Sequence, residues 1–202
     1  MDVPPVGGAG LDSRVVAAPD DGSLGPVLRI ADDRLAAGAG YGEHEHRSVD
    51  VVAVVLAGTL THRWGAGAAL AAGDVAVLRA GAGLAHDEVA GAGGARVLQC
   101  YLRSAHPSAP AAHEVHRAAG GWIDLARADA ALWVGRAGPG DELTPPPGVV
   151  LVADGSGVHR AGSGPVRPPV PVTVLVWRVD GGRPSWAEDR LPSSRRTGAP
   201  PA

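Results

Sequence analysis

Short apolar runs separated by glycine-rich turns recur along most of the chain. Between residues 27 and 104 these runs are VLRIADDRL, VDVVAVVLAGTLTHRW, ALAAGDVAVLRAG, AHDEVAG and ARVLQCYLRS, and after residue 130 they are ALWVGRAGPGDEL, GVVLVADGSGVHRAG and VPVTVLVWRVDGG. Valine-rich runs at a spacing of about ten residues are typical of strands in a β-sandwich or β-barrel. The 30 glycines and 18 prolines also favour many turns and short elements. We therefore predict an all-β fold.

The two halves of the chain resemble each other loosely. Residues 51–78 and 148–176 each read as a strand, a glycine turn, a second strand and another glycine turn. A duplicated small β-barrel would produce this repetition. We expect, in chain order, a loose N-terminal segment over 1–25, a first barrel over 26–105, a linker over 106–120, a second barrel over 121–182 and a flexible tail over 183–202.

Charge and composition narrow the expected partners. The net charge is −3 and no basic stripe is present, which argues against direct binding to nucleic acid. All 18 basic residues are arginine, which excludes lysine Schiff bases and Walker-type phosphate binding. The N-terminus does not read as a signal peptide, and no stretch approaches the ~20 apolar residues that span a membrane. Cys100 is alone and reads as a buried hydrophobe, so we expect a cytoplasmic protein.

Two pairs of potential metal ligands stand out from this background. His44 and His46 are one residue apart on a predicted strand, and so are His86 and Glu88. Because a strand repeats every two residues, each pair points to one side of its strand. Three imidazoles and a carboxylate suit Fe(II), Mn, Ni, Co or Cu with positions left for solvent or substrate. The competing interpretation, a solvated polar stretch, explains one such pair more easily than two.

These pairs lie within two longer motifs. The motifs are G-x-H-x-H-x3-D-x7-G, from Gly42 to Gly58, and G-D-V-x7-G-x2-H-x-E, from Gly73 to Glu88. They resemble the two cupin motifs in the form used by the pirin family, and the similarity covers about residues 28–115. The resemblance implies two cupin (jelly-roll) barrels in tandem, of which the second usually lacks ligands. Here the second half contains His159 and no ligand pair.

The same resemblance implies a ligand set and a cofactor. Carried over by position, the ligands are His44, His46, His86 and Glu88. The implied cofactor is one divalent transition metal per chain, Fe(II) first, with Mn, Ni, Co, Cu or Zn as alternatives. Asp50 stands where the family usually has glutamate, which alters an expected hydrogen bond behind the ligands. Glu45 replaces a usual proline, and the loop after Trp64 is shorter than in the family; these changes bear on the substrate more than on the metal.

Three functional hypotheses follow from the resemblance. The first is a quercetinase-like dioxygenase acting on a flavonol-like or catechol-like small molecule, with Glu88 as both ligand and catalytic base. The second is a non-enzymatic, metal-dependent binding or regulatory protein with a protein partner. The third is an isomerase, cyclase or other lyase, since this fold carries many chemistries. We place the enzyme first because the set of ligands is complete.

The remaining candidates are assigned structural roles. We expect His62 to be exposed on its strand or packed at the barrel mouth. His113 and His116 fall in the expected linker, where a chance pair is the simpler interpretation. The tryptophans of the second half are expected in the core or between the barrels; they are Trp122, Trp133 and Trp177.

Overall fold

The structure is a computed structural model that describes residues 9–19 and 21–180. Its regular elements are thirteen β-strands, and no helix occurs among the described residues. That part of the chain therefore offers no helix with the length and apolar character needed to cross a membrane. The expected tail at 183–202 lies outside the described residues, as does part of the expected N-terminal segment. The all-β prediction is confirmed.

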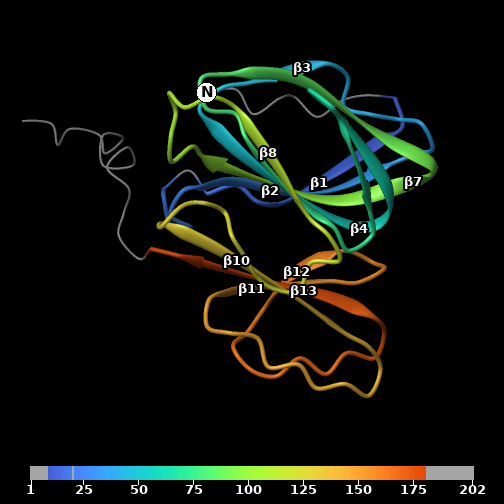
Figure 1. The fold of residues 1–202 in the computed structure, drawn as a ribbon. Coiled ribbons are helices and arrows are strands. Elements are labelled where there is room, and N and C mark those ends of the chain that lie inside the picture. The colour runs from blue at the N-terminus through green and yellow to red at the C-terminus, as the bar shows by residue number, and fades with distance from the viewer. Residues whose placement is uncertain (1–8, 20, 181–202) are drawn as a thin grey trace, which may run out of the picture.

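The first eight strands form one antiparallel sheet, in the upper half of Figure 1. Six of them follow the order β1-β2-β7-β4-β6-β8. Their bounds are β1 Leu11–Ala17, β2 Val27–Leu35, β3 His44–His46, β4 Val49–Arg63, β5 Ala68–Ala71, β6 Val75–Arg79, β7 Leu84–Arg103 and β8 Ala112–His116. Two strands are long: β4 has 15 residues and β7 has 20. β5 pairs with one end of β4, and β3 pairs with one end of β7. This additional pairing builds the first cupin barrel, into which β3 brings its two histidines.

The last five strands form a second antiparallel sheet in the order β12-β11-β13-β10-β9. Their bounds are β9 Gly121–Ile123, β10 Ala130–Ala137, β11 Val149–Ala153, β12 Val158–Ala161 and β13 Val172–Val179. An isolated bridge between Leu143 and Val166 joins the two loops that pack on the outer side of this sheet. The result is a second, smaller β-domain, so the predicted arrangement of two β-domains in tandem is confirmed.

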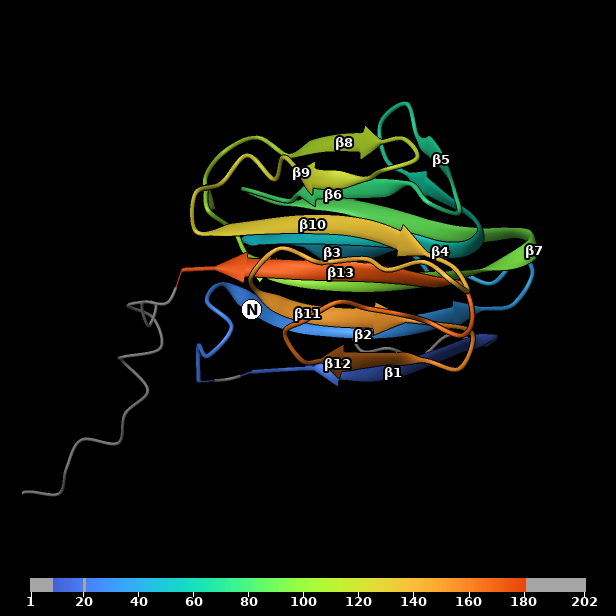
Figure 2. The same ribbon diagram turned by 90° about the horizontal axis from the view of Figure 1, so that it is seen from below.

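The two sheets lie face to face, with their strands running in similar directions (Figure 2). The alternation along β4 shows how the sequence builds both layers. Val52 and Val54 enter the core shared with the second sheet, whereas Ala53 and Val55 enter a separate core within the first half. A strand buried on both faces needs a continuous apolar run, which is what VVAVV provides. Trp177 from β13 is 1% exposed and belongs to the shared core.

Two segments expected without regular structure contain strands. The expected loose segment contains β1, which forms because it pairs along β2, with Leu11 opposite Leu35. The expected linker contains β8, which forms because it pairs with β6, with His113 opposite Leu78. In both cases the partner strand supplies hydrogen bonds that local composition does not reveal. Trp122 also differs from expectation: it is 45% exposed, with the Arg178 guanidinium 4.5 Å from its ring centre.

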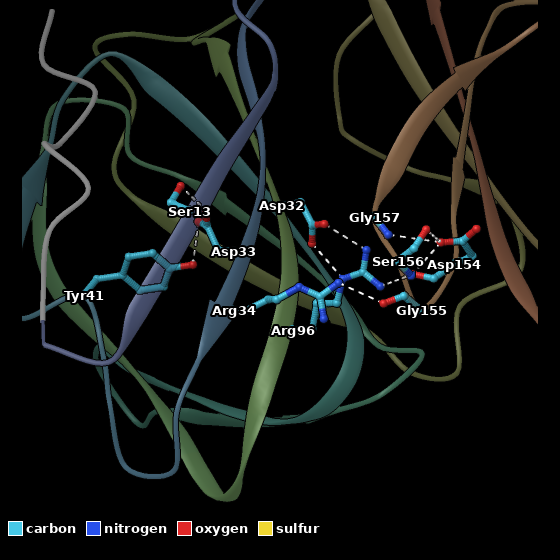
Figure 3. A network of polar contacts seen from close by, with 10 residues as sticks. All are labelled: Ser13, Asp32, Asp33, Arg34, Tyr41, Arg96, Asp154, Gly155, Ser156 and Gly157. Carbon is cyan, nitrogen blue, oxygen red and sulfur yellow. Dashed lines mark hydrogen bonds and ion pairs between the residues drawn. The ribbon is translucent and has the colours of Figure 1, made fainter.

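Polar side chains add to the apolar contact between the halves (Figure 3). The Arg96 guanidinium donates to both oxygens of Asp32, at 2.7 and 2.8 Å, and also to the carbonyl oxygen of Asp154. Arg34 donates to the carbonyl oxygen of Gly155 at 3.1 Å. The turn between β11 and β12 is thereby fixed to β2 and β7 of the first sheet.

Candidate metal centre

Pairing between β3 and β7 brings three histidines together. His44 lies directly opposite His86 in the register, and His46 shares a strand face with His44. The ring centres are 4.7 Å apart for His44 and His46, 4.5 Å for His44 and His86, and 5.0 Å for His46 and His86. Their potential ligand nitrogens all lie within 4.8 Å of one another. The strand geometry thus gathers three of the four predicted ligands around one point.

The imidazole nitrogens in this cluster have few protein partners. Nδ1 of His44 lies 2.7 Å from the carbonyl oxygen of Gly42, so Nδ1 carries the proton and Nε2 keeps its lone pair. That Nε2 atom is 3.0 Å from Nε2 of His46. Nδ1 of His46 and both ring nitrogens of His86 are buried without a hydrogen-bond partner. Buried polar atoms without partners are costly, and a bound cation would satisfy them.

The protonation state of the rings also suits a metal. Burial lowers the pKa of His46 to about 4, assisted by the neighbouring charge of His44. Burial likewise lowers the pKa of His86 to about 3. Both rings are therefore neutral near pH 7 and have lone pairs available for coordination. The three residues fit a divalent transition metal, which imidazole ligands favour.

Glu88 lies beside this cluster rather than inside it. It follows His86 on the same face of β7, and its side chain faces His62 and Gln99. Burial alone would raise the pKa of Glu88, but the charge and hydrogen bonding of His62, followed by the charges of His86 and His44, lower the pKa to about 2. The carboxylate is therefore ionised. Its role as fourth ligand and catalytic base stays a prediction.

The prediction that His62 is exposed on its strand is wrong, and the alternative, that it packs at the barrel mouth, stays a prediction. His62 is 2% exposed, and its Nε2 atom lies 2.9 Å from Oε1 of Glu88. Its Nδ1 atom lies 3.1 Å from Nε2 of His113, with the two rings stacked 4.9 Å apart. The strand period could have placed His62 inside, because Leu60, two residues earlier, is fully buried. No sequence signal points to His113 or to Gln99.

Asp50 is placed away from the three-histidine cluster. It is buried on β4, and its Oδ2 atom accepts a hydrogen bond from Nη1 of Arg127 at 2.8 Å. Burial, the largest cause, raises the pKa of Asp50. Asp50 thus contacts the second half of the chain through Arg127, and it also accepts hydrogen bonds from Ser104 and from the backbone of Ala105. The predicted hydrogen bond behind the ligands stays a prediction.

Asp33 is another of the buried carboxylates in the first half. Its two oxygens accept hydrogen bonds from the hydroxyl groups of Ser13 and Tyr41, the latter at 2.8 Å (Figure 3). These two hydrogen bonds explain how the Asp33 carboxylate is accommodated in the interior. Within the part of the chain that the structure describes, His44, His46 and His86 are the one group of three or more such side chains with metal-binding geometry.

Comparisons with known proteins agree with this arrangement. Residues 18–102 match the family model described as pirin. A putative quercetin 2,3-dioxygenase of Zymomonas mobilis is 39% identical over 72 residues, which are 35% of this chain and 31% of that protein. One from Pseudomonas aeruginosa is 41% identical over 59 residues, 28% of this chain and 25% of that protein. The matched segments therefore span less than a third of these curated relatives.

Solved structures extend the likeness in fold to most of the chain. The pirin YhhW of Escherichia coli, in complex with nickel(II), superposes with a TM-score of 0.61 at 19% identity and covers 85% of this chain and 92% of its own. A quercetin 2,3-dioxygenase of Acinetobacter baumannii gives a TM-score of 0.58 at 19% identity, covering 81% and 78%. At these identities the likeness shows a shared fold.

Proposed function

Since this chain is a cupin of the pirin family, we propose that its first barrel binds one Fe(II) ion and uses O2 to oxidise a flavonol-like or catechol-like molecule. The observation that carries this proposal is the three-histidine cluster, with its neutral rings and its buried nitrogens lacking partners. Three histidine ligands leave positions on a six-coordinate metal for substrate and solvent.

The residues of the site divide into two tasks. His44, His46 and His86 would hold the metal, which when bound supplies Lewis-acid and redox chemistry towards an enediol and O2. Glu88 would take the proton from the substrate hydroxyl group. Its carboxylate is ionised and buried next to the cluster, so its oxygens carry no proton before the substrate binds.

The names of the bacterial relatives support a flavonol as the first substrate to test, because two of them are called putative quercetin 2,3-dioxygenases. The nickel(II) complex of the E. coli pirin supports the binding of a divalent metal by a protein of this fold. Catechols extend the test because they present the same pair of neighbouring oxygen atoms without the flavonol ring system. The short loop after Trp64 is the reason to include such smaller substrates.

Oxygen uptake by the metal-loaded protein tests the proposal. The protein is purified without chelators, loaded anaerobically with Fe(II) and mixed with a panel of flavonols and catechols. We expect the wild type to consume O2 in proportion to substrate. At saturating metal, Glu88→Gln should lower turnover by about 10²–10⁴-fold, the usual range for general acid–base catalysis. His106→Gln, at an exposed position, serves as the control.

Two outcomes would contradict the proposal. If the wild type holds one equivalent of metal but consumes no O2 across the panel, the dioxygenase assignment fails and the metal-dependent binding function takes its place. If Glu88→Gln turns over as fast as the wild type, Glu88 is not the base and the three histidines alone form the active site.

A further inference from the structure

We propose that His62 and His113 are positioning residues that hold the Glu88 carboxylate in place beside the three-histidine cluster. This inference rests on the proposed function, because it assigns these two histidines a task in the same metal site. The side chains of Glu88, His62 and His113 form a continuous line from the interior of the first barrel to the edge strand β8. We call this set the buried histidine line.

The contact between His62 and Glu88 follows from strand pairing. The two residues lie opposite each other in the register of β4 and β7, and each is 2% exposed. Their atoms Nε2 and Oε1 are 2.9 Å apart. The other oxygen of Glu88 accepts a hydrogen bond from the side-chain amide of Gln99. Each carboxylate oxygen thus has one neighbour and keeps further lone pairs for a metal or a proton.

His113 fixes the ring of His62 from the other side. A nitrogen that faces a carboxylate carries a proton, since a lone pair there would be repelled. The other ring nitrogen of His62, Nδ1, lies 3.1 Å from Nε2 of His113, so the two imidazoles share a hydrogen bond there. The two rings also stack, with an angle of 23° between their planes. The His62 ring is therefore held by a hydrogen bond, by stacking and by its contact with Glu88.

The line is placed where it can affect a metal at the three-histidine cluster. The ring centre of His62 is 6.2 Å from that of His86, so the line lies directly beside the three-histidine cluster. Side chains that orient metal-binding groups from behind typically change metal affinity or activity by about 10–100-fold when they are removed. Replacing His62 with an apolar residue would leave Oε1 of Glu88 without its neighbour and allow the carboxylate to turn.

A double-mutant cycle on metal binding tests this inference in the full-length protein. Co²⁺ affinity is measured by calorimetry, and the Co²⁺ absorption spectrum reports the ligand geometry, for the wild type, His62→Leu, Glu88→Gln and the double variant. We expect His62→Leu to weaken Co²⁺ binding about 10–100-fold and to change the spectrum. In the double variant the loss should equal that of Glu88→Gln alone, because His62 acts through Glu88.

Three further variants separate positioning from general damage to the fold. His62→Gln keeps an N–H group that reaches towards Glu88, so it should recover part of the affinity lost in His62→Leu. His113→Phe keeps an aromatic ring for stacking but removes the nitrogen that hydrogen-bonds to His62, so it should weaken Co²⁺ binding less than His62→Leu does. His106→Gln, at an exposed position, should bind Co²⁺ like the wild type. If His62→Leu does not fold, His62→Gln and His113→Phe decide the question.

Unchanged Co²⁺ affinity in a folded His62→Leu protein, or additive losses in the double variant, would overturn the inference. If instead the wild type binds no divalent metal, the proposed function fails, and the line is judged in the metal-free protein by the ¹⁵N chemical shifts of the imidazole rings. A proton on Nε2 of His62, the nitrogen that faces Glu88, supports the line, and an Nε2 atom without a proton contradicts it.

Discussion

Arg127, in the second half of the chain, donates from Nη1 to Oδ2 of Asp50, in the first half, at 2.8 Å. The same guanidinium holds both oxygens of Asp129, at 2.7 and 3.0 Å. The side chain of Arg127 is 2% exposed and that of Asp50 is 5% exposed. The two cupin domains are therefore joined by a buried ion pair as well as by apolar contact.

We predict that Arg127→Met destabilises the protein strongly, because it removes the buried guanidinium that pairs with Asp50 and Asp129. The expected loss in the free energy of unfolding is about 3–5 kcal/mol, as for other buried pairs from which one partner is removed. Urea denaturation measures it. Arg167→Met is the matched control, since the Arg167–Glu142 pair is exposed and such pairs contribute about 0–1 kcal/mol. Equal losses in the two variants would contradict the prediction.

Asp74 should contribute stability that depends on pH. Its carboxylate accepts hydrogen bonds from the backbone amides of Ala71 and Ala118 and from Arg117. Burial alone would raise the pKa of Asp74, but these bonds lower it below its usual value of 3.8. At pH 7 we expect Asp74→Asn to lose about 1–3 kcal/mol of unfolding free energy. Asp12→Asn, at an exposed position, should lose little.

The sign of the pH dependence follows from the lowered pKa of Asp74. A carboxyl group with a lower pKa in the folded state stabilises the protein fully above its unfolded pKa, and this stabilisation is lost as the pH falls through the folded pKa. The difference in unfolding free energy between wild type and Asp74→Asn should therefore be constant above about pH 5 and shrink below pH 3.8. A difference that grows on acidification would show that the pKa is raised.

Metal removal should leave the fold intact. The ligands lie on strands that are paired independently of any ion, so we expect the chelated protein to keep its β-sheet circular dichroism spectrum. Adding metal at about 100 times its dissociation constant should stabilise the protein by about 2.7 kcal/mol and raise the melting temperature. Elemental analysis should find one metal per chain, and none in the His44→Ala, His86→Ala double variant. Complete unfolding on chelation would indicate a structural metal site instead.

Gly58 should be irreplaceable for two separable reasons. Its φ angle is +72°, and a Cβ atom there would lie 2.1 Å from the carbonyl oxygen of Gly94. Gly38 has a φ of +70°, but a Cβ atom on it would meet no other described residue within 4 Å, so it isolates the backbone strain. We expect Gly38→Ala to cost about 1 kcal/mol and Gly58→Ala about 3 kcal/mol or more, measured by urea denaturation. Equal losses of unfolding free energy in the two variants would mean that the clash at Gly58 is relieved without a cost in stability.

The sequence predicts the centre of the site well because that geometry is local. The period of a strand alone places His44 beside His46, and His86 on the same side as Glu88. The long apolar run of β4 likewise indicates a strand buried on both faces. These features depend on residues that are neighbours in the sequence.

Features that depend on distant pairing could not be predicted in the same way. His113 reaches His62 only because β8 pairs with β6, and the proline- and alanine-rich segment around it shows no strand pattern. The polar neighbours Thr61 and Arg63 favour an exposed position for His62, although they point away from the interior. Composition predicts a loose segment around β1 because the ladder with β2 that stabilises it is formed by another part of the chain.

The first half of the chain, which carries the candidate metal ligands, needs the second half to cover one face of its sheet, because the two sheets share a core. Leu98 and Leu102 of β7 are fully buried in this core, against residues such as Leu132 and Leu175 from the second sheet. The first barrel expressed alone would expose this apolar surface to water, and we expect it to aggregate. Heating should therefore melt the two cupin domains in a single cooperative transition. A chain of this kind can lose residues from its loops, but it cannot lose the second barrel, although that barrel has no ligand pair.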